Sequence, residues 1–156
     1  SQWARLRDAQ REVACEDERA DLVVAIDLGE ANDIHPLQKK DVAERAGMVF
    51  DRLVYGKKVV LSPKTVKTGV SADGRVTVTF DQPLAGGPVY EFELAGADGR
   101  FVNADADADG NMVVVRCGGV TNPVQVRYAW KDNPAKANCY GRNGLPATPF
   151  SVYINK

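Results

Sequence analysis

Apolar side chains in the first third of the chain recur at helical intervals, with one break. In residues 2–13 they stand three or four positions apart, which predicts an amphipathic helix. A continuous apolar run in residues 21–28 is typical of a strand buried on both faces, as in a parallel sheet. Pro36 suits the first position of a second helix, and Gly56 can end that helix in a left-handed conformation. Residues 1–57 are therefore predicted to form helix, strand and helix, the last part of an α/β layer structure.

After residue 57 the pattern changes to the two-residue period of half-buried strands. Four segments are strand candidates: residues 76–80, 90–94, 112–117 and 123–130. Three Asp-Gly pairs are typical of tight turns: Asp73-Gly74, Asp98-Gly99 and Asp109-Gly110. Short strands with regular turns predict a small antiparallel β-sandwich over residues 58–156, so the predicted fold class is α+β.

Charge and composition exclude some partners. The formal net charge of −1 gives no bulk attraction to nucleic acid or to an anionic membrane. No apolar run approaches the roughly 20 residues needed to span a bilayer. We therefore expect neither nucleic acid nor a membrane as a partner. Cys15, Cys117 and Cys139 have no metal-binding spacing, so buried free thiols and one disulfide with a thiol left over both stay open.

His35 is the one histidine of the chain, and it lies in a polar stretch between the predicted strand and the second helix. Loops at the carboxyl ends of strands are where α/β proteins form their sites. A histidine there can act as a general base near neutral pH. The positive end of the helix would disfavour the imidazolium form, and Asp33 is near enough in sequence to orient the ring. An ordinary surface histidine fits the same pattern.

The acidic run at residues 105–110 is similar in part to a calcium-binding loop. Asp105, Asp107, Asp109 and Gly110 match four positions of an EF-hand loop. The position that requires a bidentate glutamate holds Arg116 instead, and the flanks are typical of strands. We therefore interpret the run as an acidic β-turn and expect no metal.

Aromatic and amide side chains cluster near the end of the chain. Trp130, Tyr128 and Tyr140 could stack on a sugar ring, but aromatic residues in such places more often belong to a core or an interface. Asn133 and Asn138 lie with Tyr140 in a polar loop. Our hypothesis is that this loop docks onto the α/β part.

Two blocks of sequence carry a family resemblance. Asp27-Leu28-Gly29-Glu30, followed by Asn32-Asp33-Ile34-His35-Pro36, resembles the signature block of the sialate O-acetylesterase family, whose members are SGNH (GDSL-like) hydrolases with a flavodoxin-like α/β domain. Residues 3–10 are similar to the helix before that block. Residues 126–130, 133–134 and 144–150 resemble the closing segment of the family. The resemblance therefore covers the C-terminal portion of these enzymes.

The resemblance implies a serine carbohydrate esterase that removes O-acetyl groups from sialic acid or related sugars and needs no cofactor. The histidine of the block activates the serine, a role that carries over to His35. Many SGNH hydrolases hold the acid of the triad three residues before the histidine, where this chain has Asn32. Asp33 is therefore the carboxylate candidate, and a dyad without an acid is the alternative.

The nucleophile expected from the resemblance has no counterpart in the chain. The four serines are Ser1, Ser62, Ser71 and Ser151, and none follows a strand in a glycine-flanked elbow. Because a triad needs nucleophile and base within hydrogen-bond reach, we expect the serine on an N-terminal SGNH segment, from the same gene or a separate chain. This chain alone should be inactive, and we expect the enzyme to be secreted or periplasmic. The alternative function is a non-catalytic carbohydrate-binding or interaction module.

Overall fold

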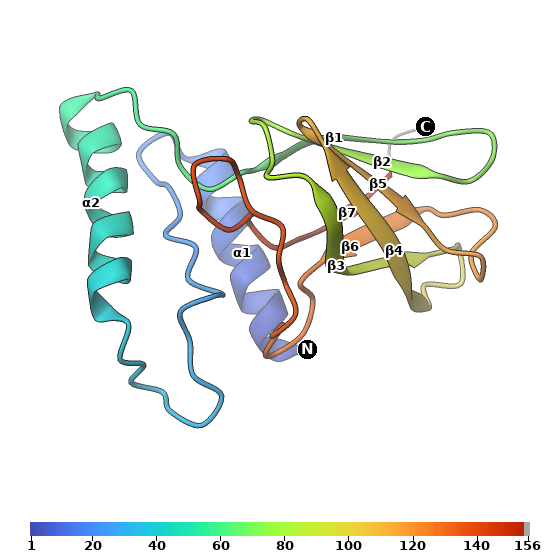
Figure 1. Cartoon of the computed structure of the whole chain (residues 1–156), viewed down its shortest axis with the longest axis horizontal. Coiled ribbons are helices and arrows are strands. Elements are labelled where there is room, and N and C mark those ends of the chain that lie inside the picture. Colours follow the sequence, from blue (N-terminus) through green and yellow to red (C-terminus); the bar gives the residue numbers. More distant parts are fainter. Residues whose placement is uncertain (155–156) are drawn as a thin grey trace.

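The computed structural model describes residues 1–154 as two helices followed by an antiparallel sheet (Figure 1). The helices are α1 (Gln2–Glu16) and α2 (Lys39–Tyr55). The strands are β1 (Thr65–Val70), β2 (Val76–Phe80), β3 (Gly87–Ala95), β4 (Phe101–Asp109), β5 (Met112–Arg116), β6 (Gln125–Tyr128) and β7 (Phe150–Tyr153). The predicted α+β class and both predicted helices are confirmed, whereas β1, β4 and β7 had not been predicted.

Helix α1 forms where the apolar spacing predicts it, but its apolar stripe faces outward. Ser1 caps the helix, since its hydroxyl oxygen accepts the backbone N–H of Ala4 at 3.2 Å. Trp3, Leu6 and Val13 are each at least half exposed, while Ala4 is buried. The spacing therefore identified the helix correctly, although no other element of the described residues covers the stripe.

Helix α2 begins at Lys39 and not, as predicted, at Pro36. The backbone N–H of Lys39 donates to the carbonyl oxygen of Leu37 at 2.7 Å, and Gln38 between them has φ −72° and ψ 48°. These angles are those of an inverse γ-turn, which cannot continue into an α-helix. At the other end Gly56 has φ 62°, which confirms its predicted left-handed conformation.

Residues 21–28 do not form the buried strand that their apolar run predicted. Within residues 1–154 the segment pairs with no strand, because helices and not strands lie beside it. Helix α2 holds the segment through ion pairs from Arg45 to Asp27 at 2.7 Å and from Arg52 to Asp21 at 3.0 Å. Figure 1 shows the segment running between α1 and α2. The predicted SGNH part is thus a helix, an extended segment and a helix, without a sheet.

The seven strands form one antiparallel sheet in the order β1-β2-β5-β4-β3-β6-β7. The predicted antiparallel β-sandwich is consistent with this arrangement in its general form, but the strands belong to one continuous sheet. Twisted strands curl the sheet until its two edges approach each other. The hydroxyl of Thr68 in β1 donates to the carbonyl oxygen of Tyr153 in β7 at 3.3 Å. The sheet is therefore nearly closed around a single core.

Aromatic rings make up the centre of that core. The centroids of Phe92 and Tyr128 are 4.8 Å apart, and the Phe150 ring lies 6.3 Å from each of them. Phe80 contacts Phe150 edge-on at 6.3 Å. All four side chains are almost completely buried, so the sheet owes much of its stability to the removal of these rings from water.

The three predicted Asp-Gly turns are confirmed. They join β1 to β2, β3 to β4 and β4 to β5. The glycine φ angles are 79° at Gly74, 70° at Gly99 and 59° at Gly110, a region that other residues rarely adopt. These turns fix which strands become neighbours.

The loop between β6 and β7, residues 129–149, is called the C-terminal loop below. It crosses the connection that leads from α2 into the sheet. The Asn143 side chain donates to the carbonyl oxygen of Leu61 at 2.9 Å, and the Thr148 N–H donates to that of Pro63 at 2.9 Å. In Figure 1 this orange-to-red loop lies between the helices and the sheet, which places it beside the segment that precedes His35.

Candidate functional site

His35 lies in residues 28–38, called the histidine loop below, which connect the extended segment to α2. The imidazole side chain is 84% exposed. Ile34 and Leu37 beside it are also exposed, at 83% and 82%. The ring can therefore be reached by a group from outside the described residues, as a general base that serves a serine on another segment must be.

Asp33 is the polar neighbour of His35, but its carboxylate binds the backbone and not the ring. Its Oδ1 accepts the N–H of His35 at 2.7 Å, which closes an Asx turn. The same oxygen is 3.9 Å from Nδ1 of the imidazole, beyond hydrogen-bond distance. In this arrangement Asp33 shapes the histidine loop and does not hold the ring as a triad acid would.

The expected effect of a helix N-terminus on His35 needs correction. It assumed a helix that starts at Pro36, whereas α2 starts at Lys39. The field of a helix terminus falls off within about one turn, and an inverse γ-turn separates the loop from the helix. The end of α2 therefore does not act directly on the imidazole.

The start of the histidine loop is tied to α2 and to the C-terminal loop by a cluster that is called the base clamp below: Asp27, Arg45 and Tyr140. Arg45 in α2 donates through both terminal nitrogens to the Asp27 carboxylate, at 2.7 and 2.8 Å. The Arg45 Nη1 also donates to the carbonyl oxygen of Val24 at 2.6 Å. The Tyr140 hydroxyl, from the C-terminal loop, lies 3.5 Å from Asp27 Oδ2. The clamp thus connects helix, extended segment and sheet.

The charges of the clamp are mutually stabilised. Burial raises the pKa of Asp27, but the hydrogen bonds and positive charge of Arg45 outweigh this effect, so the net pKa lies below its usual range. Burial raises the pKa of Tyr140, and the negative charge of Asp27 raises it further. Sequence reasoning assigned no role to Arg45. The available signal was a charged residue three positions after Val42, beside an otherwise apolar stripe.

The polar contacts of His35 in the described residues are with Asp33 and involve no serine. Ser1 caps α1 and donates to Asp132, and Ser71 donates to the carbonyl oxygen of Arg75 at 3.0 Å. Ser62 is buried, and Ser151 lies in β7. Each hydroxyl therefore belongs to a local structure away from the histidine loop.

Of the aromatic candidates for sugar stacking, Tyr128 is completely buried and belongs to the core. Its hydroxyl accepts the N–H of Cys139 at 3.0 Å, and burial raises the pKa of the phenol. Trp130 and Tyr140 are half-buried. Asn138 binds β3 on both sides: its Oδ1 accepts the N–H of Tyr90 at 2.8 Å, and its Nδ2 donates to the carbonyl oxygen of Pro88 at 3.0 Å. Asn138 thus anchors the C-terminal loop to the sheet.

The docking hypothesis for this loop is therefore confirmed at one of its residues. Tyr140 reaches the extended segment through Asp27, as expected. Asn138 binds the sheet instead, because it lies opposite the bulge in β3. Asn133 is exposed and makes no hydrogen bond or ion pair within the described residues.

The acidic run occupies a strand and its end, not a turn alone. Asp105, Asp107 and Asp109 are exposed on β4 at alternate positions, and Gly110 begins the turn to β5. Alternate carboxylates on a flat strand do not surround a cation as a calcium loop does. Among residues 1–154, no cluster of three His, Cys, Asp or Glu side chains could hold a metal ion.

The three cysteines are free thiols in different surroundings. Cys139 is buried, Cys117 is half-buried and Cys15 is exposed. Burial raises the pKa of Cys139 to about 12, so this thiol stays protonated and unreactive. Of the two alternatives that the sequence left open, the structure has free thiols, and only Cys139 among the three is fully buried.

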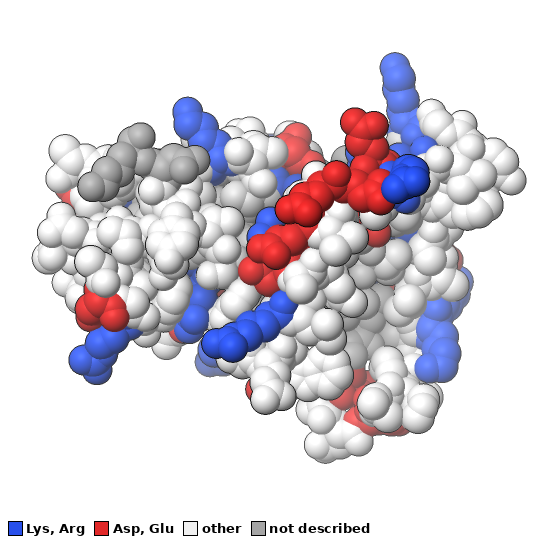
Figure 2. All heavy atoms as spheres, turned by 180° about the vertical axis from the view of Figure 1, so that it is seen from behind, with Lys and Arg blue, Asp and Glu red and all other residues white. Residues whose placement is uncertain are grey.

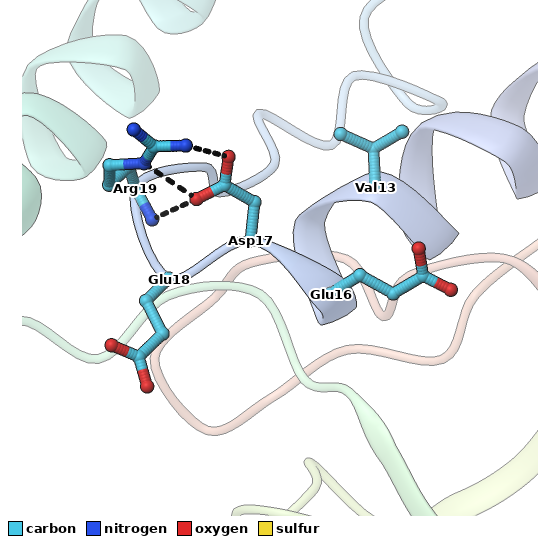
Figure 3. A pocket seen from close by; sticks show the side chains of 5 residues that line it. All are labelled: Val13, Glu16, Asp17, Glu18 and Arg19. Atoms are coloured by element: carbon cyan, nitrogen blue, oxygen red, sulfur yellow. Dashed lines mark hydrogen bonds and ion pairs between the residues drawn. The ribbon is translucent and has the colours of Figure 1, made fainter.

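A shallow depression lies at the end of α1, away from the histidine loop (Figure 3). Val13, Glu16, Asp17, Glu18 and Arg19 line it. The Arg19 guanidinium donates to the Asp17 carboxylate at 3.0 and 3.1 Å, and this hydrogen bonding lowers the pKa of Asp17. Within this lining, the charges of Arg19 and Asp17 therefore satisfy each other.

The face opposite the view of Figure 1 carries a run of acidic side chains across its middle, with separate basic side chains around it (Figure 2). Neither helix in residues 1–154 has the length and apolar character needed to cross a bilayer.

A comparison with solved structures finds a carbohydrate acetylesterase from Xanthomonas citri with 39% sequence identity and a TM-score of 0.75. The match covers 81% of this chain. This chain is similar to one part of a carbohydrate acetylesterase. It spans 31% of the length of that enzyme. No protein-family model matches the sequence, and a search of curated proteins gives no match. The similarity supports a relationship to carbohydrate esterases at this general level.

Proposed function

We propose that the chain is the histidine-bearing, C-terminal part of a serine carbohydrate esterase that removes O-acetyl groups from sialic acid or related sugars. The observation that carries the proposal is the 39% identity to a carbohydrate acetylesterase over 81% of this chain. The exposed imidazole of His35, in a loop tied to α2, agrees with it. The substrate preference for sialic acid comes from the sequence resemblance.

In this proposal His35 is the general base. It takes the proton of the serine hydroxyl as the serine oxygen attacks the acetyl carbonyl carbon, and it returns that proton to the departing sugar oxygen. Water, deprotonated by the same imidazole, then releases acetate from the acetyl-serine. In the present arrangement Asp33 Oδ1 is 3.9 Å from Nδ1 of His35. Asp33 becomes the hydrogen-bond partner of Nδ1 if its carboxylate turns from the backbone N–H of His35 to the ring.

The serine is proposed to lie on an N-terminal SGNH segment, from the same gene or a separate chain. Such a segment would cover apolar side chains that α2 exposes: Phe50 at 51%, Val54 at 58% and Tyr55 at 65%. It would also supply a neighbouring strand for residues 21–28, whose backbone joins no sheet in residues 1–154. An exposed apolar face next to an unpaired segment is typical of a surface that is covered in the complete protein.

The test is a chimera in which this chain replaces the matching part of the Xanthomonas citri acetylesterase. We expect the chimera to hydrolyse 4-nitrophenyl acetate and acetylated sialic acid. The substitution His35→Ala should lower kcat by about 10²- to 10⁴-fold, since it removes the general base. The side chain is 84% exposed, so thermal stability should not change. Full activity in His35→Ala would refute the proposal.

Asp33 is tested in the same chimera by two substitutions. Asp33→Asn keeps an oxygen that can accept the His35 N–H, but it removes the charge; Asp33→Ala removes both. A triad acid predicts that both variants lose activity, whereas a purely loop-forming role predicts that Asp33→Asn stays active. Titration of the isolated chain with glycans tests the alternative function, a non-catalytic carbohydrate-binding module. Glycan binding together with a chimera that never shows His35-dependent hydrolysis would favour a binding module.

A further inference from the structure

The position of His35 depends on few contacts within the histidine loop itself. Leu28 is buried, but Ile34 and Leu37 project into solvent. Two hydrogen bonds to carboxylates organise the backbone: Glu30 Oε1 accepts the N–H of Leu37 at 3.1 Å, and Asp33 accepts that of His35 at 2.7 Å. With so little packing, the placement of the loop depends on its polar attachments, among them a hydrogen bond from Lys39 Nζ to the carbonyl oxygen of Pro36 at 2.9 Å.

The first of these attachments is the base clamp, at the start of the loop. Asp27 immediately precedes the loop, and Arg45 lies in the helix that follows it. Their ion pair is bidentate, and the two side chains are only 17% and 13% exposed. A planar guanidinium held by two carboxylate oxygens and the Val24 carbonyl has a defined orientation, which a lysine at the same position could not reproduce. The clamp therefore fixes the beginning of the loop relative to α2.

The clamp also reaches the connection between β2 and β3, two strands of the sheet. The Tyr140 hydroxyl points to Asp27, and the Tyr140 backbone is fixed, since its carbonyl oxygen accepts the N–H of Ala85 at 2.9 Å. A short bridge between Tyr140 and Pro146 holds the other side of this strand-like segment. A movement of the sheet relative to α2 would therefore change the contact between Tyr140 and Asp27.

We propose that Arg45 and Asp27 are positioning residues for His35, and that Tyr140 couples their placement to the β-sheet. The role of His35 as the base rests on the proposed function above. The assignment of the clamp as the device that places the histidine loop rests on the contacts alone. In this view the sheet serves the esterase as a support for the histidine loop and need not bind sugar.

The first experiment measures amide hydrogen exchange at His35 and Leu37, whose backbone N–H groups are bonded to carboxylates of the loop. It uses the chain itself and needs no activity. Arg45→Met should speed exchange at both sites at least tenfold, with a smaller effect in Arg45→Lys. The matched control is Arg52→Met, which removes an ion pair between the same helix and Asp21, where Lys64 remains as a partner. Equal exchange in Arg45→Met and Arg52→Met would overturn the proposal.

Tyr140→Phe removes the hydroxyl that contacts Asp27 and keeps the ion pair between Asp27 and Arg45. It tests whether Tyr140 contributes to the placement of the loop, and it does not require Arg45→Met to fold. It should speed exchange at His35 and Leu37 by a measurable factor below that of Arg45→Lys. No change there would remove Tyr140 from the proposal. Circular dichroism and thermal unfolding of each variant separate local loosening from global unfolding.

The second experiment measures the acetylesterase chimera. Arg45→Met should lower kcat by about 10²-fold with KM within twofold, because misplacing a catalytic group by about 1 Å has an effect of that size. A rise in KM with kcat unchanged would contradict a positioning role. If the chimera shows no His35-dependent hydrolysis, the proposed function fails, while the exchange experiment still decides whether the clamp places the loop.

Discussion

Gly141 lies where the C-terminal loop crosses the connection between α2 and the sheet. A Cβ atom at this position would stand 2.5 Å from Asn143 Oδ1, 2.9 Å from Pro63 Cγ and 3.1 Å from Gln82 Oε1. The side chains cannot move aside freely, because Asn143 and Gln82 both donate to the carbonyl oxygen of Leu61. Glycine is needed here for close approach and not for an unusual φ angle.

We predict that Gly141→Ala destabilises the protein by about 1–3 kcal/mol, the usual cost of forcing an extra methyl group into a packed site. Urea unfolding measures the free energy. Gly69→Ala is the matched control, because a Cβ at Gly69 meets no atom within 4 Å. Equal stability of the two variants would show that the loop crossing is looser than described.

At the residue scale, sequence and structure agree best for side chains whose role is local. The glycines of the Asp-Gly turns and Gly56 were predicted, since a left-handed residue at a turn or helix end depends on its immediate neighbours. Arg45 was not assigned a role, because its partner Asp27 is distant in sequence and only the fold brings the two together.

The element with the least burial is α2, which has no fully buried residue. Its apolar side chains recur at the helical intervals that the sequence shows. Phe50 and Tyr55 pack against each other, with ring centroids 5.4 Å apart, and both remain more than half exposed. The spacing correctly identified an apolar face, but within residues 1–154 that face has no cover.

We predict that Val54→Ala on α2 changes the free energy of unfolding by less than about 0.5 kcal/mol, because the side chain is 58% exposed. Val78→Ala, the same substitution in β2, should cost about 2 kcal/mol, since Val78 is fully buried. Chemical denaturation of the isolated chain compares the two. A similar loss in both would mean that the α2 face is packed within this chain, against the proposed docking of an N-terminal segment.

At the scale of the whole molecule, α1 is fastened to the sheet through the start of the C-terminal loop. The Arg7 guanidinium donates to the carbonyl oxygens of Ala129 and Asp132, each at 3.3 Å, and to that of Lys131. The Asp132 carboxylate in return accepts the N–H of Trp3 at 3.1 Å and the hydroxyl of Ser1. These contacts tie the first helix to the end of β6.

We predict that Arg7→Met weakens this attachment by about 1–3 kcal/mol, since it leaves carbonyl groups without their charged donor. Hydrogen exchange of the α1 amides should rise, while exchange in the interior strands β2 and β5 should not. Arg5→Met is the control, because the Arg5 side chain is exposed and makes no hydrogen bond or ion pair with the described residues. Uniform destabilisation of helix and sheet in Arg7→Met would contradict a local attachment.

The sequence alone determined the α+β class, both helices, four of the strands, the Asp-Gly turns and the exposed loop that carries His35. These features follow from periodicity and local backbone preferences, which a few neighbouring residues set. The tertiary structure decided that the strands form one nearly closed sheet and that residues 21–28 join no sheet. It also brought Arg45, Asp27 and Tyr140 together at the base of the histidine loop. Such features depend on contacts between distant segments, which no local pattern records.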